Sequence, residues 1–462
     1  MRIFKSVCAL IVGAFSLQAA AEYTLPAYEK TTLSNGLTVY LMEQKEVPLI
    51  DVSVVVKVGA IEDKTLAGLT SFTVDNLVLG TNKLDKKSLD EKLDFIGANV
   101  FGHANHEFTT IGASFASKDE STVLPILRDI VLTPRFDSAE FEKLKKRTLL
   151  ALEQEKESPR TVISRYFNRL VFGEQGYGSV VSGSTNTLAS IGLAHVKQHH
   201  QNWYQPSNAA VIVVGDFDSK KMKQQLNKLF GSWRDTAKVT PSKVAKTKSA
   251  KQSNVVIVNK SNAGESTFLI GGLGITRDNP DSVGLSVINT ILGARFTSWL
   301  NDELRVNAGL TYGARSRFTS YSNDGSFAIS TFTKTETTTE AIDLALKTYA
   351  RLWEKGIDQQ TLESAKAYVK GQFPPNFETS TDLASLLVDM YGYQFDEDYI
   401  NTFEQQVNSL TVEKTKSLVD KYFPKENLQF VVVGKASEIQ EKLSKYGEVS
   451  TVNIEDAGFA IK

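Results

Sequence analysis

Apolar residues along the chain repeat in two ways, every second residue in short runs and at helical spacing in longer segments. The first half is predicted to contain strands at 37–42 and 50–58, a helix at 66–79, two short strands within 100–113, consecutive helices over 121–172 and a last strand at 210–214. The second half repeats this plan with strands at 255–258, 267–273 and 428–433. Because strands and helices cluster instead of alternating singly, the pattern predicts an α+β fold, a mainly antiparallel sheet with helices packed on one face.

Two pairs of segments recur at nearly the same spacing, which indicates an internal duplication. Residues 135–152 resemble 356–373, and residues 188–215 resemble 407–434. Between the copies lies a polar run, rich in Lys, Ser, Thr and Ala, that has no apolar period. We therefore expect two homologous domains, with the boundaries 22–235 and 253–462, joined by a solvated linker at 236–252.

The first residues have the pattern of a secretory signal peptide at 1–21. Arg2 and Lys5 precede an apolar run from Val7 to Leu17 that is too short to span a bilayer, and Ala19-Ala20-Ala21 offers a cleavage site. Cleavage there removes Cys8, the only cysteine of the 462 residues, and with it any disulfide, cysteine metal site or cysteine nucleophile. The sequence thus predicts export to the periplasm, and no later segment is apolar enough for a membrane span.

Charge and histidine content narrow the candidate chemistry. The 52 basic and 53 acidic side chains give a formal charge of -1, so a nucleic-acid partner is not expected, although this balance allows local basic patches. Of the five histidines, His195 and His199 have the i, i+4 spacing that suits zinc, but no carboxylate lies within two turns of them. An exposed helix face is favoured over a metal site there. His103 and His106 have an odd separation on a predicted strand and point to opposite faces, which favours surface or cross-strand packing.

One window carries a resemblance to a known family. The segment AGLTSFTVDNLVLGT, from Ala67 to Thr81, follows LSNGLTVYL and KVGAIED. This succession resembles the N-terminal signature of the pitrilysin/insulinase metallopeptidases, Asn-Gly-Leu, then Gly-Ser-x-x-Glu, then Gly-Leu-Ala-His-Phe-Leu-Glu-His-Met-Leu-Phe-x-Gly-Thr. The matching residues are Asn35, Gly36, Leu37, Gly59, Gly68, Leu69, Phe72, Leu77, Gly80 and Thr81, whereas Ala60 and Asp63 depart from the middle block. With GSTNTLASI, NWYQPSNAAVIVVGD and the duplicated plan, the resemblance covers essentially the whole mature chain.

The zinc motif of the family is missing from this window. The family's His-x-x-Glu-His places two imidazoles and a general base on one helix face, and here those positions are Ser71, Val74 and Asp75. The family's third ligand, a downstream glutamate, falls at Ala151 or Leu152. The nearby Glu153 and Glu155 would need a helix rotation to face inward and are expected to be solvated. We therefore predict that this chain binds no metal or other cofactor.

A second family signature is present in the other half. ELRVNAGLTYGA resembles the family's Leu-Arg-x-x-x-Gly-Leu-x-Tyr segment and places Arg305 and Tyr312 at its arginine and tyrosine. In active relatives this pair faces the metal across a closed chamber, holds the peptide and stabilises the polarised carbonyl. Without the resemblance, Arg305 would be expected to pair with Glu303 or Asp302 on the surface, and Tyr312 to begin an ordinary strand.

The two signatures together predict a subunit of a two-chain enzyme. The resemblance implies a zinc-bearing homologous subunit as partner, with zinc held by that partner, a peptide as substrate, and Arg305 and Tyr312 complementing the partner's site. An edge strand near Ala98 to Phe108 could bind substrate by strand addition, although Phe101 stands where many active members carry an asparagine. The alternatives are a non-catalytic homodimer that binds peptides or scaffolds a complex, and an independent hydrolase with unrecognised chemistry.

Overall fold

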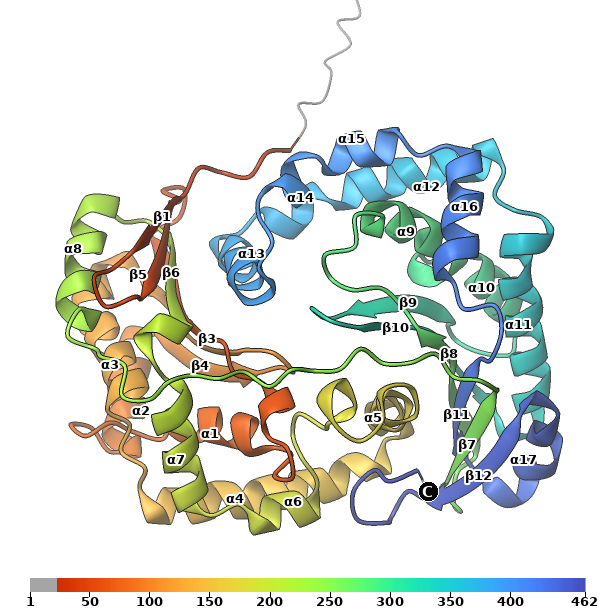
Figure 1. Cartoon of the computed structure of the whole chain (residues 1–462), viewed down its shortest axis with the longest axis horizontal. Coiled ribbons are helices and arrows are strands. Elements are labelled where there is room, and N and C mark those ends of the chain that lie inside the picture. Colours follow the sequence, from red (N-terminus) through yellow and green to blue (C-terminus); the bar gives the residue numbers. More distant parts are fainter. Residues whose placement is uncertain (1–22, 462) are drawn as a thin grey trace, which may run out of the picture.

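The computed structural model describes residues 23–461 and contains two six-stranded sheets, one in each half (Figure 1). The first sheet has the order β1-β2-β6-β3-β5-β4 and the second β12-β7-β11-β8-β10-β9. The strands are β1 (Glu29–Thr32), β2 (Thr38–Glu43), β3 (Leu49–Val56), β4 (Asn99–Ala104), β5 (Thr109–Ala116), β6 (Ala209–Gly215), β7 (Asn254–Asn259), β8 (Glu265–Leu273), β9 (Arg315–Ser320), β10 (Gly325–Lys334), β11 (Gln429–Gly434) and β12 (Glu448–Asn453). The predicted signal peptide lies outside the described residues.

The helices of the first half are α1 (Leu69–Leu77), α2 (Lys86–Ile96), α3 (Glu120–Leu132), α4 (Ser138–Gln154), α5 (Pro159–Phe172), α6 (Thr185–Ser190), α7 (Leu193–Trp203) and α8 (Ser219–Phe230). Those of the second half are α9 (Ser282–Asn289), α10 (Trp299–Asn301), α11 (Thr338–Glu354), α12 (Gln359–Gln372), α13 (Ser380–Tyr393), α14 (Asp398–Asn401), α15 (Phe403–Asn408), α16 (Val412–Tyr422) and α17 (Ala436–Leu443). Within residues 23–461, no helix is long and apolar enough to cross a membrane.

The two sheets share one topology. In the first, β3 lies antiparallel between β5 and β6 while β2 runs parallel to β6; in the second, β8 lies antiparallel between β10 and β11 while β7 runs parallel to β11. Only the outermost strand differs, since β1 is antiparallel to β2 and β12 is parallel to β7. The predicted α+β class with mainly antiparallel sheets is confirmed.

One helix of each half packs on the sheet of the other half. Helix α5 packs on β8 and β11 of the second sheet, and α13 packs on β3 and β6 of the first, so both helices lie between the two sheets in Figure 1. Val162 and Phe167 of α5 share an apolar cluster with Val431 of β11, and Leu387 of α13 shares another with Ile212 of β6. Because each buried aliphatic or aromatic side chain contributes about 1.5–3 kcal/mol, this exchange couples the stability of the two halves.

The two ends of the described chain follow the same exchange. Near the start, Tyr23 stacks on Phe377 with ring centroids 5.5 Å apart, and the Tyr28 hydroxyl donates a 2.6 Å hydrogen bond to Glu397 Oε2. Phe377 and Glu397 both belong to the second half, so the N-terminal segment of the first half packs against the second.

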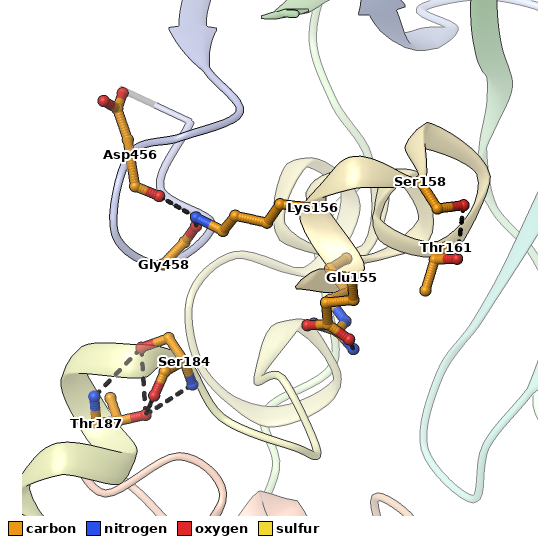
Figure 2. Close-up of polar contacts among 9 residues, drawn as sticks. Glu155, Lys156, Ser158, Thr161, Ser184, Thr187, Asp456 and Gly458 are labelled. Atoms are coloured by element: carbon orange, nitrogen blue, oxygen red, sulfur yellow. Dashed lines mark hydrogen bonds and ion pairs between the residues drawn. The ribbon is translucent and has the colours of Figure 1, made fainter. Parts of the chain in front are cut away.

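The C-terminal segment of the second half likewise packs against the first half. Lys156 Nζ donates to the backbone carbonyls of Asp456 and Gly458, as Figure 2 shows. Phe459 is buried with its ring centroid 5.2 Å from that of Tyr166 on α5. The tail therefore covers the turn that joins α4 to α5.

No helix or strand forms between α8 and β7, where the linker was expected. The segment is nevertheless fixed to both halves. Ser242 donates from its backbone N and its Oγ to Glu62, at 2.8 and 2.6 Å, and Thr247 donates in the same way to Asp324, at 2.9 and 2.8 Å. The linker is therefore polar and has most of its side chains at the surface, as its composition predicts, but hydrogen bonds hold it against both halves.

Candidate functional site

A buried polar cluster fixes the start of helix α1, which carries the degenerate zinc motif. The Asp63 carboxylate accepts hydrogen bonds from the backbone N of Gly68 and of Thr70, both at 2.9 Å, and from Thr70 Oγ1 at 2.5 Å. These bonds satisfy donors that a helix N-terminus leaves without partners. The Nε2 atom of His199, from α7, lies 3.2 Å from Thr70 Oγ1. Burial raises the pKa of Asp63 to about 7 and lowers that of His199 to about 4.

The histidine expectations are corrected in two places. His199 is 5% exposed, so the helix face that it shares with His195 is not simply exposed, because α7 packs against α1. His195 is at the surface, where its Nδ1 accepts a 3.1 Å hydrogen bond from Gly192 N. His106 lies in the turn after β4 and not on a strand, and its Nε2 is 3.0 Å from the Ser179 carbonyl oxygen. Burial lowers the pKa of His106 to about 4.

Val74, at the general-base position, belongs to the hydrophobic core. Its side chain is 0% exposed and contacts β4. The contact is close because β4 has a glycine there, and a Cβ on Gly102 would lie 2.8 Å from Val74 Cγ2. Ser71 and Asp75 are half-buried on the same helix. The general-base position is thus filled by a core side chain that cannot accept a proton.

Asp75 is the one motif position that retains an ionisable group. Burial raises its pKa to about 6, and Arg147 on α4 partly opposes this shift. A carboxyl whose pKa is higher in the folded than in the unfolded state stabilises the fold at low pH, and this contribution is lost as the pH rises through the folded-state value.

Replacing Asp75 with asparagine is accordingly expected to change the pH dependence of stability. Between about pH 4 and pH 7, the free energy of unfolding of the wild type should fall by about 1–2 kcal/mol relative to that of Asp75→Asn. Urea titrations at several pH values measure this difference. Asp94→Asn, at an exposed position of α2, is the matched control and should track the wild type. Parallel pH profiles for Asp75→Asn and the wild type would contradict the assignment.

The region of the family's third ligand offers no metal ligand either. Leu152 is buried in an apolar cluster with Phe72 and Leu188, whereas Ala151 and Glu153 are exposed. The expectation that Glu155 is solvated was wrong, because Arg165 of α5 holds its carboxylate through both NH1 and NH2, the latter at 2.6 Å (Figure 2 labels Glu155). Across residues 23–461, no group of three or more His, Cys, Asp or Glu side chains is arranged to hold a metal ion.

Arg305 and Tyr312 are presented at the surface of the second half. Arg305 lies on the short helical turn η7 (Asp302–Asn307), and its guanidinium carbon is 4.7 Å from the ring centroid of Phe296. Tyr312 is 82% exposed and stacks on Phe332 of β10 with centroids 6.3 Å apart.

The surface pairing considered for this segment is not formed. Glu303 instead pairs with Arg351 at 3.1 Å, and Tyr312 lies in the loop before β9 and does not begin a strand. The chain does not bring its two signatures together, since α10, which immediately precedes η7, and α1 lie on opposite sides of the molecule in Figure 1.

The predicted edge strand is β4, which pairs with β5 alone. Phe101 is 42% exposed and lies opposite Gly112, and its ring occupies the space that a Cβ on Gly112 would need. The outer edge of β4 is therefore unpaired and lies near α1, and it carries Phe101 where many active family members have an asparagine.

Comparisons with known proteins identify the family of the chain. The family described as insulinase (peptidase family M16) matches residues 38–184, and the peptidase M16 inactive domain matches residues 190–369. The zinc protease PqqE of Helicobacter pylori is 25% identical over 414 residues, which cover 87% of this chain and 92% of that protein. The non-peptidase homolog YmxG of the same organism is 22% identical over 379 residues, covering 81% and 86%.

Solved structures share the fold. The peptidase M16 inactive domain from Pseudomonas fluorescens superposes with a TM-score of 0.82 at 23% identity, covering 88% of this chain and 98% of that one. A protease from Helicobacter pylori superposes with a TM-score of 0.83 at 22% identity, covering 88% and 100%. The chain therefore belongs to the pitrilysin/insulinase family of metallopeptidases, peptidase family M16, and has Ser71, Val74 and Asp75 in place of that family's zinc motif.

Proposed function

We propose that this chain is the zinc-free subunit of a periplasmic two-chain peptidase and that it complements the zinc site of a homologous partner. The observation that carries the proposal is the contrast between the two signatures. Val74 is closed into the core at the general-base position, whereas Arg305 and Tyr312 are held at the surface without an ion pair or hydrogen bond to the described residues. One signature has lost its chemistry and the other remains available to a second molecule.

The groups of this chain would act on the peptide backbone. The Arg305 guanidinium offers several fixed donors to carbonyl oxygens, and its stacking on Phe296 limits the directions that it can take. The Tyr312 phenol can donate a hydrogen bond to the oxyanion that develops during attack on the peptide. Zinc and the general base would belong to the partner, where the metal polarises the carbonyl and activates water.

The relatives support a division of roles between chains. Helicobacter pylori contains one relative named a zinc protease and another named a non-peptidase homolog, and each aligns with more than four-fifths of this chain. A two-chain peptidase needs one member of each kind. The signal-peptide pattern at 1–21 is the basis for proposing the periplasm as the compartment.

The test is reconstitution with a zinc-bearing homologue from the same genome. We expect little peptide cleavage by either chain alone and efficient cleavage by the mixture. Arg305→Ala and Tyr312→Phe should lower kcat/KM of the mixture by about 10- to 100-fold, because each removes a donor that acts in the transition state. Gel filtration should show unchanged assembly.

Matched controls separate catalysis from general damage. Arg147→Ala and Tyr368→Phe alter an exposed arginine and an exposed tyrosine on other helices and should leave the rate unchanged. Full activity of both the Arg305 and the Tyr312 variants would refute the complementing role. Self-association of the chain without any zinc-bearing partner would favour the homodimeric peptide-binding or scaffold function instead.

A further inference from the structure

Arginines without carboxylate partners are concentrated between residues 295 and 317 of the second half. Of the thirteen arginines between residues 23 and 461, seven form ion pairs. Four of the other six lie between residues 295 and 317, and these are Arg295, Arg305, Arg315 and Arg317. Arg295 donates to Ser364 Oγ at 3.1 Å, whereas Arg315 and Arg317 are exposed and keep their donors and their charge for a ligand.

Two of these arginines occupy alternate positions of β9. Arg315 and Arg317 are exposed, and their side chains leave the same face of the sheet. They stand opposite Ser330 and Ala328 of β10, whose small side chains leave the guanidinium groups accessible. Alternate residues of a strand are about 7 Å apart, which is also the separation of alternate side chains in an extended peptide.

The other two arginines do not share the face of this pair. Gly293, two residues before Arg295, approaches β9 on its other face, since a Cβ there would lie 2.5 Å from Ser316 Oγ. Phe296 follows Arg295 directly and stacks under the guanidinium of Arg305. We therefore restrict the name arginine rim to Arg315 and Arg317.

The arginine rim distinguishes β9 from its equivalent in the first half. Both β9 and β4 are edge strands, each hydrogen-bonded to a single neighbour. Strand β4 has the sequence NVFGHA, without lysine or arginine, whereas β9 has RSRFTS. The duplicated topology alone therefore does not require this charge.

We propose that the arginine rim binds acidic side chains of an extended peptide. Carboxylates match the planar fork of arginine donors, and Glu-x-Glu or Asp-x-Asp spacing would place two of them opposite Arg315 and Arg317. The exposed ring of Tyr312, which stacks on Phe332 beside the same end of β10, adds an aromatic contact. Acidic peptides would then be the substrate class of the proposed peptidase subunit. Their role as substrates rests on that proposed function, whereas their binding does not.

Binding can be measured on the full chain without a partner, so its failure is distinguishable from failure of reconstitution. The probe is a fluorescein-labelled, C-terminally amidated peptide with alternating glutamates, followed by fluorescence anisotropy. We expect it to bind, to bind more weakly as salt is raised, and to lose at least about fivefold in affinity in R315Q/R317Q. A peptide with lysines in place of the glutamates should not bind.

The control variant is R147Q/R234Q, which removes the same charge from two exposed arginines of the first half, outside the rim. Equal weakening in this control, or equal binding of the lysine peptide, would overturn the proposal. Binding restricted to peptides with a free C-terminal carboxylate would overturn the assignment to acidic side chains. Displacement of the peptide by single-stranded DNA at lower concentration than by unlabelled acidic peptide would assign the rim to nucleic acid instead.

Discussion

Asp63→Ala should lower the free energy of unfolding by about 3–5 kcal/mol. The substitution leaves the backbone N–H groups of Gly68 and Thr70 without their acceptor in a buried position, and each unsatisfied buried donor costs about 1–3 kcal/mol. It also removes the acceptor of the 2.5 Å hydrogen bond from Thr70 Oγ1, which is worth about 1 kcal/mol. Urea denaturation at constant pH measures the loss.

Two variants make this prediction specific. Asp63→Asn keeps one acceptor oxygen and is expected to lose less stability than Asp63→Ala. Asp94→Ala removes an exposed carboxylate from α2 and should be nearly neutral. An alanine variant as stable as the wild type would show that the cluster around Asp63 does not hold α1.

The same carboxyl predicts a pH effect. Burial raises the pKa of Asp63 to about 7, so the folded state holds this proton more tightly than the unfolded state, where the pKa is near 4. The stabilisation is complete below about pH 4 and disappears as the pH rises through about 7. The slope of stability against pH should therefore be smaller in Asp63→Ala than in the wild type.

Asp63 also illustrates which features of the structure the sequence predicts and which it does not. Local periodicity placed the strands well, since those predicted at 37–42 and 50–58 are found as β2 (Thr38–Glu43) and β3 (Leu49–Val56). The family signature located the motif positions on α1. The sequence does not predict which residues are in contact in space. Nothing near Asp63 in the sequence indicates that it bonds to the start of α1 or that His199 lies beside Thr70.

The exchange of helices between halves had no sequence signal either. The apolar stripes of α5 and α13 show that each helix is partly buried, but a stripe does not specify which sheet it covers. The unpaired state of Arg315 and Arg317 was hidden for the same reason, because an ion pair can form between residues far apart in the chain. Periodicity therefore predicts elements, and only the three-dimensional packing identifies the arginine rim.

Val74→Glu, which restores the family's residue at the general-base position, should destabilise the chain by about 4 kcal/mol or more. The new carboxylate would enter a site where Val74 is 0% exposed and where Gly102 of β4 is already in contact. An unpaired buried charge costs several kcal/mol, and the longer side chain adds overpacking of about 1–3 kcal/mol. Thermal unfolding of the purified variant tests this result.

Two further variants test the motif positions of α1. Leu150→Glu adds the same side chain at an exposed position of α4 and should be close to neutral. The triple variant S71H/V74E/D75H should not bind zinc tightly, because no ligand follows at Ala151 or Leu152 and Glu155 is held by Arg165. Stoichiometric zinc in the triple variant would mean that α1 retains a usable metal site. Wild-type stability of Val74→Glu would mean that the core has room for the carboxylate. The expected instability means instead that the core has closed around Val74, in agreement with the zinc-free role that we propose.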